Sequence, residues 1–149
     1  EELRNKGKYD IGENIRRALE MDFGGGFASE EETAAAIKKV FDATGYVLDT
    51  HTAVGYSVYK KYAEKTGDKR KNVVVSTASP YKFTVDVLKS LHKPTGPDEF
   101  KLIEELRRVS KTPVPVGIKD LDKKPILHKT VSQKEDMKEQ VKKVLNLKY

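Results

Sequence analysis

The sequence predicts an α/β fold in which a small, mostly parallel sheet is flanked by helices. Apolar residues recur every three to four positions through much of the chain, which indicates amphipathic helices. A run of valines, Val73-Val74-Val75, leads into two hydroxyl residues and then into a helix-start signal at Ser79-Pro80. Strands that alternate with helices favour parallel pairing through right-handed crossovers.

The expected helices each carry a start or a stop signal. A Ser, Thr or Asp at the first position can accept free backbone amides of the first turn, and glycine favours the left-handed conformation that ends a helix. Capping boxes at Ser29–Glu32 and Ser132–Glu135 are the clearest of these signals. The expected helices cover Tyr9–Phe23, Ser29–Thr44, Thr50–Thr66, Ser79–Leu91, Asp98–Ser110 and Ser132–Leu147. Their apolar spacing predicts that core-facing residues include Ile37, Leu106, Met137, Val141 and Val144.

The strand predictions rest on three extended stretches. Asn72–Ser76 is the most strand-like run, and Tyr46–Asp49 is a shorter one. Pro113–Gly117 contains two prolines, which cannot donate to a ladder, so we expect an extended loop or a sheet edge there. This is a small sheet for 149 residues, so either the rest is helical packing or the sheet continues in chain outside this sequence.

Length and composition indicate one globular domain, residues 1–149, with a single core. The chain has no cysteine, which excludes disulfides, thiolate metal sites and a cysteine nucleophile and fits a cytoplasmic location. No apolar run approaches the ~20 residues of a membrane span, so no membrane contact is expected. The first residues carry neither a signal peptide nor an initiator methionine, so we expect a portion of a larger protein.

The net charge of +6 raises the question of a nucleic-acid partner. The basic residues are interspersed with acids, as in Lys134–Glu139, and form no block of like charges. We therefore expect solvated helix faces and no nucleic-acid partner. A stand-alone basic module that binds polyanions remains the alternative function from a different class.

Several side chains could carry chemistry, and each has a structural alternative. Asp49 and His51 could form an acid–base pair, or Asp49 could cap a helix. Ser76 and Thr77 could hydrogen-bond a ligand ring or satisfy backbone amides. The run Gly24–Gly26 could cradle a phosphate, but it lacks the following Lys-Ser/Thr, so a connector is favoured.

Two histidines and a lysine are further candidate groups. His92 and His128 stand apart from other metal ligands, so no metal site is expected. Lys82 lies in the first turns of the helix after Pro80, where it could meet a phosphate or lie in solvent.

Two motifs together resemble the threonine synthase family. Residues 49–56, Asp-Thr-His-Thr-Ala-Val-Gly-Tyr, resemble its Asp-Pro-His-Thr-Ala-Val segment, and residues 76–83, Ser-Thr-Ala-Ser-Pro-Tyr-Lys-Phe, resemble its Thr-Ala-His-Pro-x-Lys-Phe segment. The resemblance is good over about residues 20–90 and loose beyond. Thr50 replaces the family's usual Pro, so we expect a different turn before His51. Ser79 replaces a frequent His, so any ligand contact that this His makes in relatives is changed or lost here.

The resemblance implies a pyridoxal-phosphate enzyme of fold type II, a lyase that converts O-phospho-L-homoserine and water to L-threonine and phosphate. It places Thr77 against the pyridine nitrogen of the cofactor, with Ser76 as the fallback. It puts Asp49, His51, Ser79 and Lys82 near the site.

The family's Schiff-base lysine and phosphate loop have no counterpart in this sequence, and Lys82 matches the Pro-x-Lys-Phe lysine instead. The resemblance therefore implies the carboxyl-terminal part of the enzyme, without a catalytic residue of its own and inactive alone. Its expected partners are the missing amino-terminal part and a small-molecule substrate, and self-association is expected where apolar surface is uncovered. A fragment of a related pyridoxal-phosphate lyase is the remaining alternative.

Overall fold

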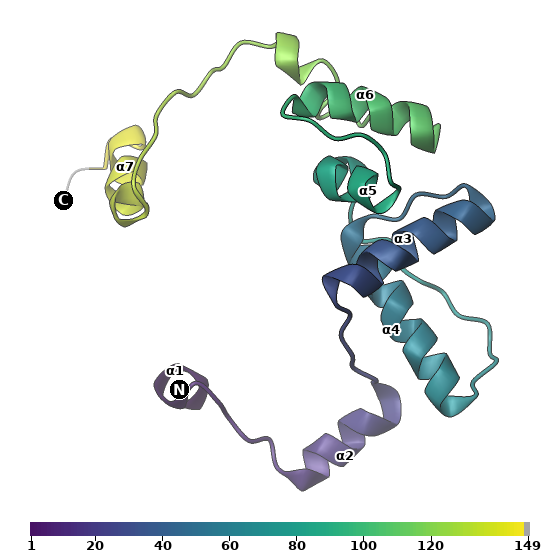
Figure 1. The fold of residues 1–149 in the computed structure, drawn as a ribbon. Helices are drawn as coiled ribbons and strands as arrows, with labels where there is room; N and C mark the ends of the chain where they lie inside the picture. The colour runs from purple at the N-terminus through teal and green to yellow at the C-terminus, as the bar shows by residue number, and fades with distance from the viewer. Residues whose placement is uncertain (148–149) are drawn as a thin grey trace. The chain divides into compact units, whose positions relative to one another are not determined.

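The computed structural model describes residues 1–147, and every regular element among them is a helix or a 3-10 turn (Figure 1). Residues Glu1–Pro115 form one compact unit, and a smaller unit begins at Val116. None of the described helices has the length and apolar character needed to cross a membrane. The elements are α1 (Glu2–Lys6), α2 (Glu13–Asp22), α3 (Glu30–Thr44), α4 (Thr50–Thr66), η1 (Pro80–Phe83), α5 (Thr84–Ser90), α6 (Glu99–Ser110), η2 (Leu121–Lys123), η3 (Lys134–Asp136) and α7 (Met137–Val144).

The core of the larger unit is built by α3, α4, α5 and α6. Helix α3 packs against α4 and α5, and α5 packs in turn against α6 (Figure 1). Ile37 of α3, Val87 and Leu88 of α5 and Leu106 of α6 have no solvent-exposed surface. These side chains come from positions that recur with helical spacing, so the periodic apolar pattern is what buries this core.

The capping signals explain where α3 begins and ends. The Ser29 hydroxyl accepts the Glu32 amide at 3.2 Å, while the Glu32 carboxylate accepts the Ser29 amide at 2.8 Å. Both bonds of the predicted capping box are therefore present. Gly45 ends the helix with φ of 74°, a left-handed conformation that a side chain disfavours, and the predicted stop is confirmed.

The starts of α4, η1 and α6 also follow their sequence signals. Asp49 caps α4, the Ser79 hydroxyl accepts the Tyr81 amide at 3.3 Å, and Asp98 accepts the Lys101 amide at 3.2 Å. The helix predicted from Ser79 begins as a 3-10 turn and continues as α5. These local signals were sufficient because a cap bonds to its own first turn and needs no distant partner.

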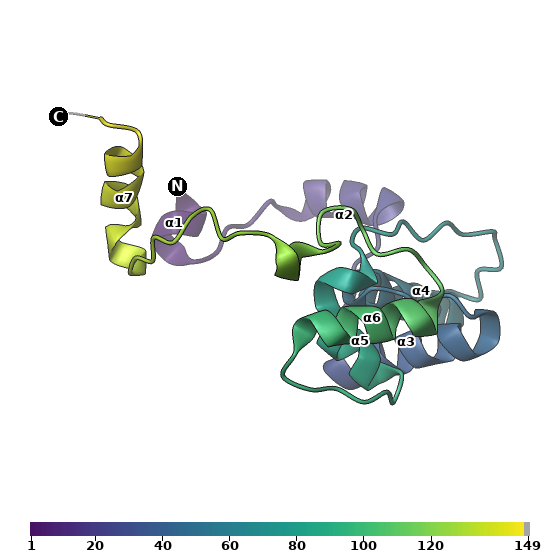
Figure 2. The ribbon, with the colours of Figure 1, turned by 90° about the horizontal axis from the view of Figure 1, so that it is seen from above.

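The predicted sheet is wrong: no strand forms anywhere in residues 1–147. Asn72–Ser76 is extended but unpaired, and Val73 and Val75 are 85% and 72% exposed. The connection from α4 to α5 that contains them arcs away from the helices in both views (Figures 1 and 2). β-branched residues favour a strand only when a neighbouring strand offers a ladder and a surface to pack on, and neither lies beside these valines.

Helices α2 and α7 are amphipathic but bury none of their residues. In α7 the residues predicted to face inward, Met137, Val141 and Val144, are each more than half exposed. The predicted capping box at Ser132 is also wrong, because Gln133 precedes a 3-10 turn there and no side chain caps α7. Periodicity identified both helices but extended each beyond its observed ends, and it could not say what covers them.

Truncation of a buried core residue tests this packing. We expect Leu88→Ala to lower the free energy of unfolding of the chain by about 2–5 kcal/mol, because it removes a fully buried side chain and leaves a cavity. Val144→Ala, at a residue that is 72% exposed, should change it by less than about 0.5 kcal/mol. Urea unfolding followed by circular dichroism measures both, and equal losses would contradict the core described here.

Candidate functional site

The carboxylate of Asp49 lies buried at the start of α4. Its Oδ1 accepts the backbone amides of His51 at 2.9 Å and Thr52 at 3.2 Å, and the residue is only 1% exposed. The positive end of the helix stabilises a negative charge placed there. Asp49 therefore acts as the cap of α4, one of the two roles that the sequence left open.

Thr52 connects this cap to the segment before α5. Its hydroxyl donates to Oδ2 of Asp49 and accepts the backbone amide of Thr77 at 3.4 Å. The same oxygen lies 3.4 Å from the Ser76 hydroxyl. Because Asp49 takes the only proton of the Thr52 hydroxyl, a lone pair of that oxygen is left to accept the Thr77 amide. We call these four residues, Asp49, Thr52, Ser76 and Thr77, the Asp49–Thr77 cluster.

The two candidate cofactor contacts differ in how their hydroxyls are used. Ser76 Oγ lies close to Thr52 and also donates to the carbonyl of Ala78 at 3.4 Å. The side-chain oxygen of Thr77 has no hydrogen-bond partner within residues 1–147, and the residue is exposed. Thr77 is thus held by its backbone while its side chain stays available to a ligand.

A ring contact joins the two sequence motifs a second time. The rings of His51 and Phe83 lie 4.9 Å apart, and the Lys82 ammonium stands 5.4 Å from the Phe83 ring centroid. His51 Nδ1 is 3.8 Å from Asp49 Oδ1, which is too long for a hydrogen bond. Asp49 and His51 therefore do not form the acid–base pair that the sequence allowed. His51 instead projects, 61% exposed, beside Phe83.

The structure brings the predicted site residues into one neighbourhood at the start of α4. Asp49, His51, Ser76 and Thr77 are linked as described, and Ser79 caps η1 while Lys82 covers Phe83. Thr52 is the residue that sequence reasoning missed, although a hydroxyl three positions after a capping Asp was visible as a signal. Within the described part of the chain, no three His, Asp or Glu side chains are grouped so that they could hold a metal ion.

The glycine run lies at a hollow of about 780 Å³ beside α4. Two of the cations that line it are paired: Lys61 bonds to Glu32 at 2.6 Å, and Arg70 bonds to Asp68. Lys71 also lines it and forms no ion pair within residues 1–147. The hydrogen bond from Lys61 lowers the pKa of Glu32, and the Arg70 guanidinium lowers the pKa of Asp68 to about 2. The run Gly24–Gly26 lacks the Lys-Ser/Thr that follows the glycines of a phosphate loop, so it is better explained as a connector.

Close approach explains one of these glycines directly. A Cβ at Gly26 would lie 2.8 Å from Cγ1 of Val58 on α4, nearer than side-chain atoms tolerate. The connector therefore passes against α4 only because this position lacks a side chain.

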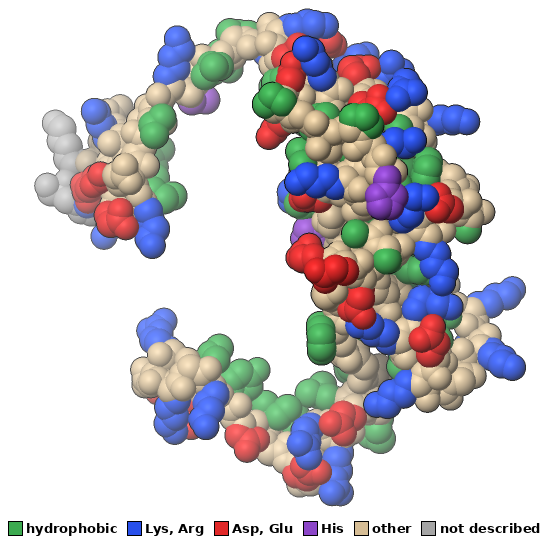
Figure 3. All heavy atoms as spheres, in the orientation of Figure 1, with side chains coloured by type: hydrophobic (Ala, Val, Ile, Leu, Met, Phe, Trp, Pro, Cys, Tyr) green, Lys and Arg blue, Asp and Glu red, His purple; other side chains and the backbone are tan. Residues whose placement is uncertain are grey.

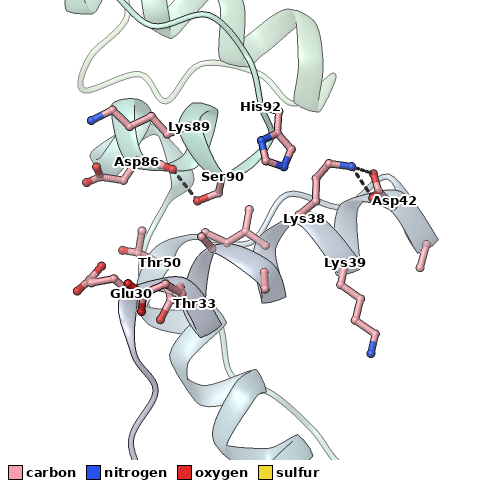
Figure 4. Close-up of a pocket in the computed structure, with 15 residues that line it drawn as sticks. Glu30, Thr33, Lys38, Lys39, Asp42, Thr50, Asp86, Lys89, Ser90 and His92 are labelled. Carbon is pink, nitrogen blue, oxygen red and sulfur yellow. Dashed lines mark hydrogen bonds and ion pairs between the residues drawn. The ribbon is translucent and has the colours of Figure 1, made fainter.

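A larger hollow lies elsewhere in the same unit, between α3 and the end of α5 (Figure 4). It has a volume of about 1000 Å³ and an apolar floor that includes Ala34 and Ile37. Charged side chains rim it, and Lys38 is held by Asp42 (Figure 4). None of Ser76, Thr77, Ser79 or Lys82 lines it, so the size of the hollow does not mark the place where the motifs meet.

Basic and acidic side chains are mixed along the described helices. Most arginines pair with acids three or four residues away on their own helix, as Arg107 does with Glu104 and Arg108 with Glu105. Lys and Arg side chains are interspersed with acidic ones on the face drawn in Figure 3. This pattern gives little support to a polyanion-binding module, which needs unpaired cations along one face.

The fold and the cluster define a helical domain that presents one unpartnered threonine hydroxyl beside a helix start. Residues 52–147 match the profile of a family described as "Threonine synthase, C-terminal". The threonine synthase of Saccharomyces cerevisiae is 32% identical over 121 residues, which is 72% of this chain and 24% of that protein. The enzyme of Schizosaccharomyces pombe is 35% identical over 83 residues, covering 55% of this chain and 16% of its own length.

Human threonine synthase-like 1 is 32% identical over 90 residues, which is 60% of this chain and 12% of that protein. The chain belongs to the threonine synthase family and carries its carboxyl-terminal domain. The resemblance stated from the two motifs is thereby confirmed. The chain spans about a quarter or less of the length of these relatives.

Removal of the buried cap tests the role assigned to Asp49. We expect Asp49→Ala to lower the free energy of unfolding by about 1–2 kcal/mol, because two amides of α4 lose their acceptor. Asp49→Asn retains a side-chain oxygen for the cap and should cost less than half as much. Urea unfolding of the chain measures both, and an Ala variant as stable as the wild type would contradict the capping role.

Proposed function

We propose that this chain is the carboxyl-terminal part of a pyridoxal-phosphate-dependent threonine synthase. The parent enzyme would convert O-phospho-L-homoserine and water to L-threonine and phosphate. Two observations support this: the family match over residues 52–147, and the unpartnered Thr77 hydroxyl held in place beside the start of α4. The Thr77 hydroxyl is the observation on which we base a cofactor contact in this chain.

The Thr77 hydroxyl suits the nitrogen edge of a pyridoxal ring. A hydroxyl can donate to or accept from the pyridine nitrogen, and the nearest carboxylate, Asp49, is occupied by α4 and Thr52. A neutral partner does not force that nitrogen to stay protonated, as a carboxylate would. When bound, the cofactor would supply an electron sink for the chemistry, while Thr77 orients its ring.

The other expected site residues divide into two groups. Asp49 and Ser79 are occupied as helix caps, so we propose that they shape the site without touching ligand. His51 and Lys82 are exposed beside Phe83, and we place them at its rim, where Lys82 can attract an anionic group of the substrate. Ser76 remains the fallback contact for the ring nitrogen.

The rest of the site would come from the amino-terminal part of the parent protein. We propose that this part holds the lysine that binds the cofactor, the loop that holds its phosphate and most residues that read the substrate. The exposed valines Val73 and Val75, and the apolar faces of α2 and α7, are surfaces that such a partner can cover. Without it, we expect the chain to self-associate. We also propose a cytoplasmic location, which suits a chain without cysteine.

The isolated chain should show no turnover. We expect no phosphate release from O-phospho-L-homoserine by this chain with added pyridoxal phosphate, because neither the lysine nor the phosphate loop is present. The full-length parent protein should release phosphate and show the visible absorbance of bound pyridoxal phosphate. Phosphate assays and absorbance spectra of the two purified proteins, side by side, measure this.

Each contrary outcome points to a different assignment. Turnover by the chain alone would contradict its dependence on the amino-terminal part. A parent protein that binds the cofactor but acts on a different substrate would indicate a related lyase. A parent protein that binds no cofactor, together with a chain whose heparin affinity falls steeply with salt, would favour the polyanion-binding module.

A substitution at Thr77 tests the proposed cofactor contact. In the parent protein we expect Thr77→Val to weaken pyridoxal phosphate binding by about five- to tenfold, the contribution of one hydrogen bond. Thr77→Ser should retain most of the affinity because it keeps the hydroxyl. Thr95→Ala, at an exposed threonine in the loop before α6, is the matched control and should bind normally. Equal binding by the Val variant would remove Thr77 from the site.

A further inference from the structure

We propose that Thr52 is a positioning residue that fixes the Thr77 hydroxyl through the Thr77 backbone. This inference deepens the proposed function, because it assigns a support to the residue proposed to meet the cofactor ring. Thr52 is 4% exposed, so it cannot itself reach a ligand in solvent. Its hydroxyl faces inward toward Asp49 and outward toward Ser76 and Thr77.

The buried carboxylate sets the direction of the Thr52 hydroxyl. Asp49 Oδ1 is already shared by two amides of α4, and Oδ2 receives the hydroxyl proton of Thr52. An ionised carboxylate can only accept, so Thr52 has to donate to it and is left with lone pairs for other donors. The amide of Thr77 uses one of them.

Thr52 is also the sole hydrogen-bonded anchor of the extended segment. Among the described residues, the one hydrogen bond from residues 72–78 to another element runs from the Thr77 amide to the Thr52 hydroxyl. The Ser76 hydroxyl, which donates to the Ala78 carbonyl, lies 3.4 Å from the same Thr52 oxygen. The valines before Ser76 are exposed and supply little packing. At 3.4 Å the hydrogen bond from the Thr77 amide to the Thr52 hydroxyl is long. Its loss should therefore change the local position of Thr77 without unfolding α4.

The first test follows the Thr77 amide in the chain itself. We expect Thr52→Val to speed hydrogen exchange of this amide by about fivefold, because its acceptor is lost. Thr52→Ser keeps the hydroxyl and should restore slow exchange. Thr33→Val is the matched control: Thr33 is 7% exposed in the first turn of α3, and its hydroxyl donates to the Ser29 carbonyl at 2.7 Å. That control should leave the Thr77 amide unchanged.

A second variant shows whether the effect of Thr52→Val comes from the lost hydroxyl or from a disturbed fold. Thr52→Val places a methyl group against the Asp49 carboxylate, so circular dichroism should first show wild-type helicity. Thr52→Ala removes the hydroxyl without adding that methyl group and should give the same faster exchange at Thr77. Exchange at wild-type rates in a folded Ala variant would overturn the proposal.

The second test asks whether Thr52 acts through Thr77 in the parent protein. We expect Thr52→Val to weaken pyridoxal phosphate binding by about fivefold and Thr52→Ser to restore it. Added to Thr77→Val, Thr52→Val should cause no further loss, because the hydroxyl that it positions is already absent. Fully additive losses would show that Thr52 affects the cofactor by another route and would overturn the inference.

The two tests separate this inference from the proposed function. Faster Thr77 exchange in the chain, with a parent protein that binds no pyridoxal phosphate, would support the anchor and reject the cofactor assignment. Normal cofactor binding by the parent protein, with no effect of Thr52 on either readout, would support the function and reject the anchor.

Discussion

The buried carboxylate of Asp49 is the interaction on which the candidate site depends. It satisfies two amides at the start of α4 and fixes the orientation of the Thr52 hydroxyl. Removing a charge of this kind from water is unfavourable unless hydrogen bonds and a helix end compensate, and here both are present. The same carboxylate therefore caps a core helix and determines how the segment around Thr77 is held.

A ligand contact on an otherwise open segment needs such support. The segment from Asn72 to Thr77 carries exposed valines and joins no sheet, and the chain bends at Ala78. A hydroxyl on a mobile segment would lose conformational freedom on binding a ligand, which reduces affinity. Because the Thr77 backbone is already anchored to α4, less conformational freedom is lost when a ligand binds.

The helices could be predicted from sequence because their determinants are local. The capping box at Ser29, the caps at Asp49 and Asp98 and the stop at Gly45 each act within one turn, and all are present, whereas the capping box predicted at Ser132 does not form. The sheet could not be predicted in this way, since pairing depends on a second strand that the valines around Val74 cannot specify.

In the core and in the site, the sequence predicted features that depend on nearby residues and missed those that depend on distant ones. Periodicity identified Ile37 and Leu106 as buried, but it missed Ala36 and Leu102, and it placed Val141 inside when it is exposed. The order of the two motifs predicted that their residues belong together. Only the structure could show that Thr52 connects them, because that contact spans 25 positions.

The most direct measurement is an experimental structure of the parent protein with pyridoxal phosphate bound. We predict that Thr77 Oγ1 lies about 2.6–3.2 Å from the pyridine nitrogen, with the Thr77 amide still directed at Thr52. We also predict that no carboxylate contacts that nitrogen. A cofactor ring placed away from Thr77, or paired there with Asp49 or another acid, would contradict the account.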